Sequence, residues 1–359
     1  MAAENPIALT AYLGRKPDAV AVLERLARTC GIRVAEFNSI DLNISQDSPC
    51  FAGFDPLPLL ETADLGLLLD SDVPLIPQYA RHAGAVKWIQ IDVDPLKSDF
   101  PMWGFPTDVR IQGDCAIVLQ QVIDAVEARA DDAWRKRVVE RIASWSGARE
   151  ATAKRRSAAG ANKGISGALN PAFVFATLNA KLSQDDVVIN EAIRNAPMLQ
   201  EHITRTRPSS YVGLAGGGLG FSGGMALGLK LARPERRIVQ VIGDGGFHFS
   251  SPDSVYAVAQ QYQIPVLTVV LDNGGWQAVK SAVQRVYPKG IAAETDQFQS
   301  RLRSGRQGEQ RDFSAVARAF GAHGECVTEP DDLDSAIDRC LSALGDGKAA
   351  VLHVHVTPL

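Results

Sequence analysis

Two apolar runs joined by a helix-like segment constrain the fold of this chain more than any other feature. Ile238–Ile242 leads into Gly243-Asp244-Gly245, and Val266–Leu271 leads into Asp272-Asn273. Both runs are typical of buried parallel strands, and Pro252–Tyr262 between them is predicted to be a crossover helix. Open α/β sheets bind ligands at the carboxyl ends of their strands. The sequence therefore predicts an α/β fold with a ligand site where these two strands end.

The residues at the two strand ends suit a metal ion and a phosphate. An Asp carboxylate and an Asn amide oxygen are hard ligands, of the kind that Mg²⁺ or Ca²⁺ prefers. The glycines around Asp244, which are Gly243, Gly245 and Gly246, let backbone N–H groups approach a phosphate closely. We therefore predict an anchor for a metal–diphosphate group at this edge of the sheet.

The paired motif resembles the thiamine-diphosphate motif of acetolactate synthase-like enzymes and 2-oxo acid decarboxylases. That motif runs from a GDG to an NN; here it runs from Gly243-Asp244-Gly245-Gly246 to Asp272-Asn273-Gly274-Gly275. The resemblance implies thiamine diphosphate and Mg²⁺ as cofactors. It also implies that Asp244, Asn273 and the Gly275 carbonyl hold the metal. Asp272 replaces the first Asn of the family pair, at a position that is not expected to bind the metal directly.

A glycine-rich segment, Leu214–Gly224, precedes a helical run that starts at Met225. In the family, the similar loop packs a large apolar side chain under the cofactor, which bends into a V shape and brings its 4′-amino group near the thiazolium C2. The resemblance places Leu219 at this wedge, beside Gly218, and makes the Gly217 carbonyl the acceptor for the 4′-amino group. A dinucleotide fingerprint is the competing interpretation. It is disfavoured because no clear strand leads directly into the loop and no acidic residue stands at the required place.

Three further residues are candidate contacts for substrate or cofactor. Glu191, with Asn190, closes the strand Val187–Ile189 at the same predicted sheet edge, where it touches substrate or cofactor or else serves domain contacts. His248 follows the first motif, and either a proton-relay or a structural role fits it. Trp276 follows the second motif and either walls the pocket or packs in the core.

Two other features stay open at the level of sequence. His353 and His355 alternate along the last predicted strand, Ala350–Val356. Two histidines on one strand face are able to bind a metal, but two ligands alone do not establish a site. The polar segment Tyr287–Arg311 is typical either of a lid over an active site or of a surface loop ordered by a partner.

Composition limits the classes of function. The chain has 359 residues, 46% of them apolar and 22% charged, and a formal net charge of −4. These values are ordinary for a globular protein with room for two domains. The composition and net charge do not indicate that the protein binds nucleic acid or a membrane. Five scattered cysteines without a C-x-x-C fit reduced thiols and a cytoplasmic location.

The order of predicted elements indicates two domains. Residues 1–130 alternate strands and helices and are predicted to form a Rossmann-like domain with a parallel sheet. Residues 131–169 are predicted to be a helical linker, polar and helical over Asp132–Arg156 and small, Gly-rich and linker-like over Ser157–Asn170. Residues 170–359 are predicted to be the diphosphate-binding domain. Asn170 is expected to cap a helix whose first residue is Pro171.

The end of the first domain resembles the central domain of the same family, which binds FAD in some members. The resemblance rests on Ile91–Pro95 followed by Ile111–Asp114. We find no convincing FAD signal and expect a structural domain. Asp92 and Asp94 are accordingly expected to cap the next helix or to face water rather than to bind a metal.

Family members usually have a third, pyrimidine-binding domain, which this chain does not match. That domain supplies the Glu that hydrogen-bonds N1′ of the cofactor and promotes formation of the ylid. We therefore expect the diphosphate-binding subunit of a split enzyme, active in a heterotetramer with a separate pyrimidine-domain subunit. The expected chemistry is decarboxylation or carboligation of a small 2-oxo acid. The alternatives are a non-catalytic cofactor-binding or regulatory subunit and an NAD-dependent oxidoreductase.

Overall fold

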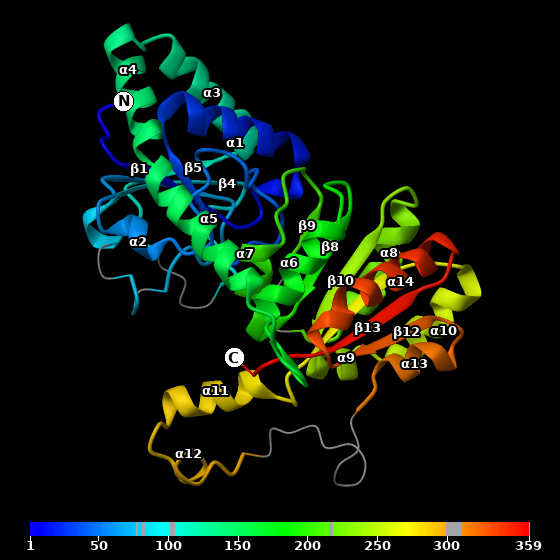
Figure 1. Ribbon diagram of the computed structural model, residues 1–359. Helices are drawn as coiled ribbons and strands as arrows, with labels where there is room; N and C mark the ends of the chain where they lie inside the picture. The colour runs from blue at the N-terminus through cyan, green and yellow to red at the C-terminus, as the bar shows by residue number, and fades with distance from the viewer. Residues whose placement is uncertain (77, 81–82, 101–104, 215–217, 299–310, 359) are drawn as a thin grey trace. The chain divides into compact units, whose positions relative to one another are not determined.

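The computed structural model of the protein describes residues 1–76, 78–80, 83–100, 105–214, 218–298 and 311–358. The chain forms two compact units (Figure 1). The first consists of Met1–Lys154 with Arg205–Leu214, and the second of Arg155–Thr204 with Ala215–Leu359. Each contains a parallel sheet flanked by helices, which confirms the predicted α/β class. Among the described residues, every helix is too short or too polar to cross a membrane.

The first unit is built on a five-stranded parallel sheet with the order β2-β1-β3-β4-β5. Its strands are β1 (Pro6–Thr10), β2 (Arg33–Glu36), β3 (Leu65–Leu69), β4 (Lys87–Asp92) and β5 (Val109–Gln112). Its helices are α1 (Pro17–Cys30), α2 (Leu57–Leu60), α3 (Cys115–Glu127) and α4 (Asp132–Ser144). Helix α1 packs against α3 and ends at Gly31, whose φ of 63° is a left-handed conformation that glycine adopts without strain. The short strand β9 (Tyr211–Val212) lies in the segment that returns to this unit.

The first unit extends beyond the boundary that we predict at residue 130. Trp134 and Val138 of α4 are buried, and Arg141 donates a hydrogen bond to the carbonyl of Cys30 at the end of α1 (3.1 Å). These contacts attach α4 to the first unit because a helix buries its apolar stripe against the neighbouring layer. The polar composition of this segment does not indicate which unit its few apolar side chains join.

Acidic side chains at the carboxyl edge of the first sheet form an internally paired cluster. Asp92 is 1% exposed and accepts hydrogen bonds from Lys97 Nζ (2.9 Å) and the Tyr12 hydroxyl (3.1 Å). Burial alone would lower the pKa of Lys97, but its hydrogen bonds to Asp92 and Asp72 raise it, so the lysine stays charged. The expectation that Asp92 caps a helix or faces water is therefore wrong. Asp94, by contrast, does accept hydrogen bonds from the backbone of the turn that follows it.

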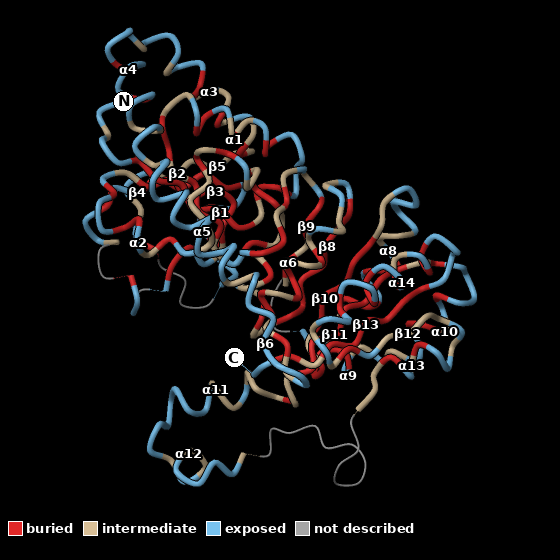
Figure 2. Tube along the Cα trace, viewed as in Figure 1, coloured by how far each residue is buried: buried red, intermediate tan, exposed pale blue. Residues whose placement is uncertain are grey.

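The second unit contains a parallel sheet with the strands in the order β12-β13-β11-β10-β8. These are β8 (Val187–Glu191), β10 (Ile238–Gly243), β11 (Leu267–Asp272), β12 (His323–Val327) and β13 (Ala350–His355), and the antiparallel pair β6 (Gly164–Ile165) and β7 (Ala168–Leu169) precedes them. The helices are α6 (Pro171–Lys181), α7 (Ala196–His202), α8 (Phe221–Ala232), α9 (Asp244–Phe249), α10 (Pro252–Tyr262), α11 (Gln277–Val286), α12 (Ile291–Thr295), α13 (Ser314–Ala319) and α14 (Leu333–Gly345). Helix α14 packs on α6, whereas α10 packs on α8 and α13. The central strands between them are buried, as Figure 2 shows.

The helix that follows α4 extends further into the predicted linker than we expect. Helix α5 (Ser146–Ala161) occupies the first part of the stretch predicted as a Gly-rich linker. Its alanines favour a helix and outweigh its glycines. The predicted cap of α6 is confirmed: Asn170 Oδ1 accepts a hydrogen bond from the Ala172 N–H (3.0 Å), and Pro171 is the first helical residue.

Candidate functional site

The two sequence motifs lie next to each other at the carboxyl edge of the second sheet. Strands β10 and β11 are parallel neighbours, with Gly243 in register with Leu271. Asp244 therefore begins where β10 ends, and Asp272 and Asn273 stand where β11 ends. The first motif does not form an open loop, because Asp244 is the first residue of the short helix α9.

The side-chain oxygens that we predict to hold a metal are buried. Within the described part of the chain, Asp244 Oδ2 and Asn273 Oδ1 have no hydrogen-bond partner. A buried polar group without a partner costs about 1–3 kcal/mol, so such groups require an explanation. A carboxylate, an amide oxygen and a backbone carbonyl are the ligands that Mg²⁺ takes, and these residues fit that ion.

The chain after Asn273 has a conformation that brings backbone groups to this edge. Gly274 and Gly275 have φ angles of 92° and 134°, which other residues rarely adopt. The Gly275 carbonyl accepts a hydrogen bond from the Gln277 N–H (2.8 Å), and an oxygen with two lone pairs has one left for a metal. The third predicted ligand is therefore compatible with this geometry.

Arg311 lies against both acidic side chains of the site. Its Nη2 donates a hydrogen bond to Asp272 Oδ1 and lies 3.6 Å from Asp244 Oδ2. Asp272 also accepts a hydrogen bond from the Gly274 N–H (2.9 Å), and its Oδ2 is 3.1 Å from His353 Nε2. The site thus contains two buried carboxylates and one guanidinium group, in addition to the predicted metal ligands.

The two carboxyl groups have opposite pKa shifts. Burial and the neighbouring Asp272 charge raise the pKa of Asp244. Burial alone would also raise the pKa of Asp272, but its hydrogen bond with His353 and the charge of Arg311 lower it. Asp272 is therefore the carboxylate that its partners keep ionised, and Asp244 is the carboxyl group that a metal ion would have to deprotonate.

Sequence reasoning did not single out Arg311 or His353 as members of this site. Arg311 ends a polar segment that we predict to be a lid or a surface loop, and nothing local distinguishes it from other arginines there. The sequence pattern draws attention to His353 only because it alternates with His355 along one predicted strand. Only the pairing of β13 with β11, which places Asp272 in register with His355, brings this strand beside the site.

Glycines next to Asp244 are required by close packing. A Cβ at Gly245 would lie 2.5 Å from the ring of Trp276, and one at Gly246 would lie 3.1 Å from Glu191 Oε1. The Gly245 N–H donates to Asp244 Oδ1 (2.9 Å). Trp276 is half-buried and packs on Phe249, with ring centroids 5.0 Å apart. The predicted phosphate contacts of Gly245 and Gly246 remain predictions.

Glu191 is fully buried and holds the start of α8. Its carboxylate accepts hydrogen bonds from the N–H groups of Gly220 and Ser222 and from the Ser222 hydroxyl. Gly220 has a φ of 86°. Glu191 thus fixes the end of the glycine-rich loop, so in this geometry it acts as a positioning residue.

Three of the remaining predicted site residues are exposed, and one lies outside the described residues. Leu219, the predicted wedge, is 41% exposed, and Gly218 beside it is also exposed. His248 is exposed in the last turn of α9. Gly217, the predicted acceptor for the 4′-amino group, is not among the described residues.

A buried hydrogen-bond chain connects Glu191 to the middle of the sheet. Ser222 Oγ accepts a hydrogen bond from Gln240 Nε2 (2.7 Å), and Gln240 Oε1 accepts one from the Thr268 hydroxyl (2.9 Å). The Tyr256 hydroxyl donates to Thr268 (2.9 Å). Fully paired networks of this kind make a core rigid, so the end of the glycine-rich loop is tied to β8, β10 and β11.

Replacing Glu191 with Gln is expected to lower the stability of the chain. A Gln side chain places an NH₂ group opposite the N–H donors of Gly220 and Ser222, so a buried donor loses its acceptor at a cost of about 1–3 kcal/mol. Chemical denaturation followed by circular dichroism measures the change. Glu201→Gln, on the exposed side of α7, is the matched control and should leave the unfolding midpoint unchanged. Identical midpoints for the two variants would show that the Glu191 contacts do not contribute to stability.

Comparison with known protein families agrees with the site geometry. Residues 194–354 match the family described as thiamine pyrophosphate enzyme, C-terminal TPP binding domain, where TPP is thiamine diphosphate. This segment is a TPP-binding domain of that family. It contains Asp244, Asn273 and the buried Arg311–Asp272 pair.

The chain is also similar to full-length enzymes of known type. A probable acetolactate synthase of Mycobacterium bovis is 32% identical over 191 residues, which cover 53% of this chain and 32% of that protein. The benzoylformate decarboxylase of Pseudomonas aeruginosa is 26% identical over 304 residues, which cover 82% of this chain and 50% of that protein. The chain thus spans half or less of the length of these curated relatives.

Solved structures share the fold of this chain. A thiamine diphosphate-dependent 4-hydroxybenzoylformate decarboxylase of Rhodococcus jostii RHA1 has a TM-score of 0.76 and 20% identity, and the match covers 99% of this chain and 62% of that one. A benzoylformate decarboxylase of Polynucleobacter necessarius has a TM-score of 0.71 and 17% identity, and it covers 100% and 62%. At these identities the likeness is evidence of fold.

Proposed function

We propose that the chain is the diphosphate-binding subunit of a thiamine diphosphate-dependent enzyme that makes or breaks a C–C bond next to a carbonyl. The observation that carries the proposal is that, among the described residues, the buried oxygens Asp244 Oδ2 and Asn273 Oδ1 of a TPP-binding domain have no hydrogen-bond partner. Relatives named as acetolactate synthase and benzoylformate decarboxylase support 2-oxo acid decarboxylation or carboligation as the reaction class.

Different residues of the chain would bind the metal and the diphosphate of the cofactor. Asp244, Asn273 and the Gly275 carbonyl would hold Mg²⁺, and Gly245 and Gly246 would present N–H groups to the diphosphate. Bound thiamine diphosphate supplies an electron sink for the carbanion that forms next to a carbonyl.

Other residues would position and shield the cofactor. Glu191 would keep the start of α8 in place, so that Leu219 stands at a fixed position beneath the cofactor rings. Trp276, packed on Phe249, would limit the access of water to the metal.

Our proposal includes a separate pyrimidine-domain subunit, which would supply the Glu for N1′ of the cofactor. The expected assembly contains two copies of each chain, since paired active sites are commonly related by a two-fold axis. The chain covers 50% of the benzoylformate decarboxylase that it matches.

The deciding experiment measures turnover of a panel of 2-oxo acids by the 359-residue chain, alone and with a candidate pyrimidine-domain subunit. We expect the chain alone to bind thiamine diphosphate in calorimetry but to lack turnover, and the complex to be active with the mass of a heterotetramer. Full turnover by the chain alone would overturn the split-subunit part. Cofactor binding without turnover in any complex would favour the alternative, a non-catalytic cofactor-binding or regulatory subunit.

A further inference from the structure

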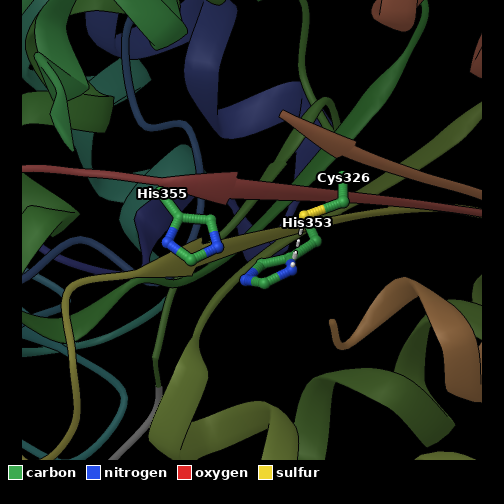
Figure 3. A group of neighbouring side chains, drawn as sticks. All are labelled: Cys326, His353 and His355. Carbon is green, nitrogen blue, oxygen red and sulfur yellow. Dashed lines mark hydrogen bonds between the residues drawn. The ribbon is translucent and has the colours of Figure 1, made fainter. Parts of the chain in front are cut away.

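An edge strand of the second sheet and its neighbour bring one cysteine and two histidines together (Figure 3). Strands β12 and β13 are parallel neighbours, and Cys326 is in register with His353. Cys326, His353 and His355 each offer one ligand atom, and these atoms all lie within 4.8 Å of one another. We propose that the three side chains bind a thiophilic divalent cation such as Zn²⁺, at a site different from the Asp244–Asn273 pair.

The hydrogen bonds of His353 leave its Nδ1, the nitrogen next to Cys326, available to bind a metal. Its Nε2 is 3.1 Å from Asp272 Oδ2, and its Nδ1 is 3.4 Å from Cys326 Sγ. Histidines that bind metals commonly donate their other ring N–H to a carboxylate, which fixes the ring and leaves the opposite nitrogen unprotonated. In this structure Nδ1 accepts a hydrogen bond from the Phe313 N–H at 3.3 Å, a long contact that a metal bond would replace.

His355 has the same division of roles between its two nitrogens. One side of the ring is hydrogen-bonded to the backbone of Arg311. Its Nε2 is buried and has no hydrogen-bond partner in the described part of the chain. The ring centroids of His353 and His355 are 4.7 Å apart, so the two imidazoles lie on the same side of β13. A metal ion would pair the orphaned nitrogen of His355.

The type of ligand indicates the type of ion. One sulfur and two imidazole nitrogens suit Zn²⁺, whereas Mg²⁺ prefers oxygen ligands. Three protein ligands leave a fourth position, and Asp312 Oδ1 lies 3.9 Å from His353 Nδ1. Cys326 is exposed, which gives the ion a path from solvent. On binding, the Cys326 S–H bond breaks, its proton passes to water, and a metal–sulfur bond forms without a change of oxidation state.

Asp272 connects this proposed site to the TPP site. Its carboxylate orients His353, and its neighbour Asn273 is a predicted ligand of the cofactor metal. The departure from the family pair, Asp in place of Asn, thus supplies the anionic partner that a metal-binding histidine commonly has. The inference does not depend on the cofactor, because its ligands and its test involve only the chain and Zn²⁺.

The test is a titration of the purified, metal-free chain with Zn²⁺ in competition with a chromophoric chelator. We expect one Zn²⁺ per chain, undiminished by excess Mg²⁺. Cys326→Ser and His355→Ala should each weaken binding by at least roughly 10–100-fold, the loss seen even when only supporting residues of a metal site are removed. With Co²⁺ as the probe, the wild-type chain should show a thiolate-to-metal absorption band that Cys326→Ser lacks.

Cys30→Ser, in the first unit, is the matched control and should bind Zn²⁺ and Co²⁺ as the wild type does. Cys326 is exposed, so its Ser variant should fold normally, and circular dichroism checks this. Two outcomes would overturn the proposal: a folded wild-type chain that takes up no Zn²⁺, or equal Zn²⁺ affinity in the wild type and in Cys326→Ser.

Discussion

Replacing Asp244 with Ala should abolish Mg²⁺-dependent binding of thiamine diphosphate while the chain stays folded. The substitution removes a buried carboxylate whose Oδ2 has no hydrogen-bond partner among the described residues, and with it the negative charge that the metal needs. We expect the affinity to fall by more than about 100-fold, which corresponds to about 2.7 kcal/mol. Isothermal calorimetry with cofactor and Mg²⁺ measures the loss. Asp253→Ala, at an exposed position of α10, is the control and should bind normally.

The pH dependence of wild-type binding gives a second readout at the same residue. Because the pKa of Asp244 is raised, its carboxyl group carries a proton when the pH is below that pKa. Mg²⁺ has to displace this proton in order to bind. Wild-type affinity should therefore increase as pH rises toward and through this raised pKa, and Asp244→Asn should lose that component. If Asp244→Ala has normal circular dichroism and wild-type affinity, Asp244 does not hold the metal.

Replacing Leu219 with Ala should reduce turnover of the assembled enzyme much more than cofactor affinity. Leu219 is 41% exposed beside the end of the glycine-rich loop, which Glu191 holds in place, so its side chain is available to pack under a cofactor. A wedge sets the geometry of the reacting groups, and a displacement of about 1 Å is able to cost roughly 100-fold in rate. The measurements are kcat of the reconstituted complex and calorimetry of the chain with the cofactor.

A matched leucine separates this effect from general loss of packing. Leu231 is 66% exposed on α8 of the same unit, and Leu231→Ala should keep wild-type turnover. Should Leu219→Ala retain full kcat in an active complex, its side chain has no role in bending the cofactor.

The local pattern of the sequence was sufficient to predict the strands and the edge where they end. The runs that become β10 and β11 are apolar throughout because both faces of the sheet are covered. The helix Pro252–Tyr262 was predicted with its observed bounds, since proline starts it and its apolar residues recur with helical spacing. Asp244 and Asn273 could be placed together because neighbouring parallel strands end at one edge.

The boundaries between units were not predictable in the same way. The polar helix α4 belongs to the first unit, where its side chains Trp134 and Val138 are buried. The segment Arg205–Leu214 also belongs to that unit, although it follows Arg155–Thr204 of the second unit in the sequence. Such assignments depend on which apolar surface a segment covers. Local composition does not contain that information when only a few of its side chains are buried.

By itself, the sequence determined the α/β class, the two strand ends and the residues predicted to hold the metal and the diphosphate. Only the tertiary structure decided that Arg311 and His353 pair with Asp272, and that Cys326 stands beside His353. The physical reason is strand order: β13, the last strand in the chain, inserts between β11 and β12. Contacts across neighbouring strands join residues far apart in sequence, and no local periodicity records them.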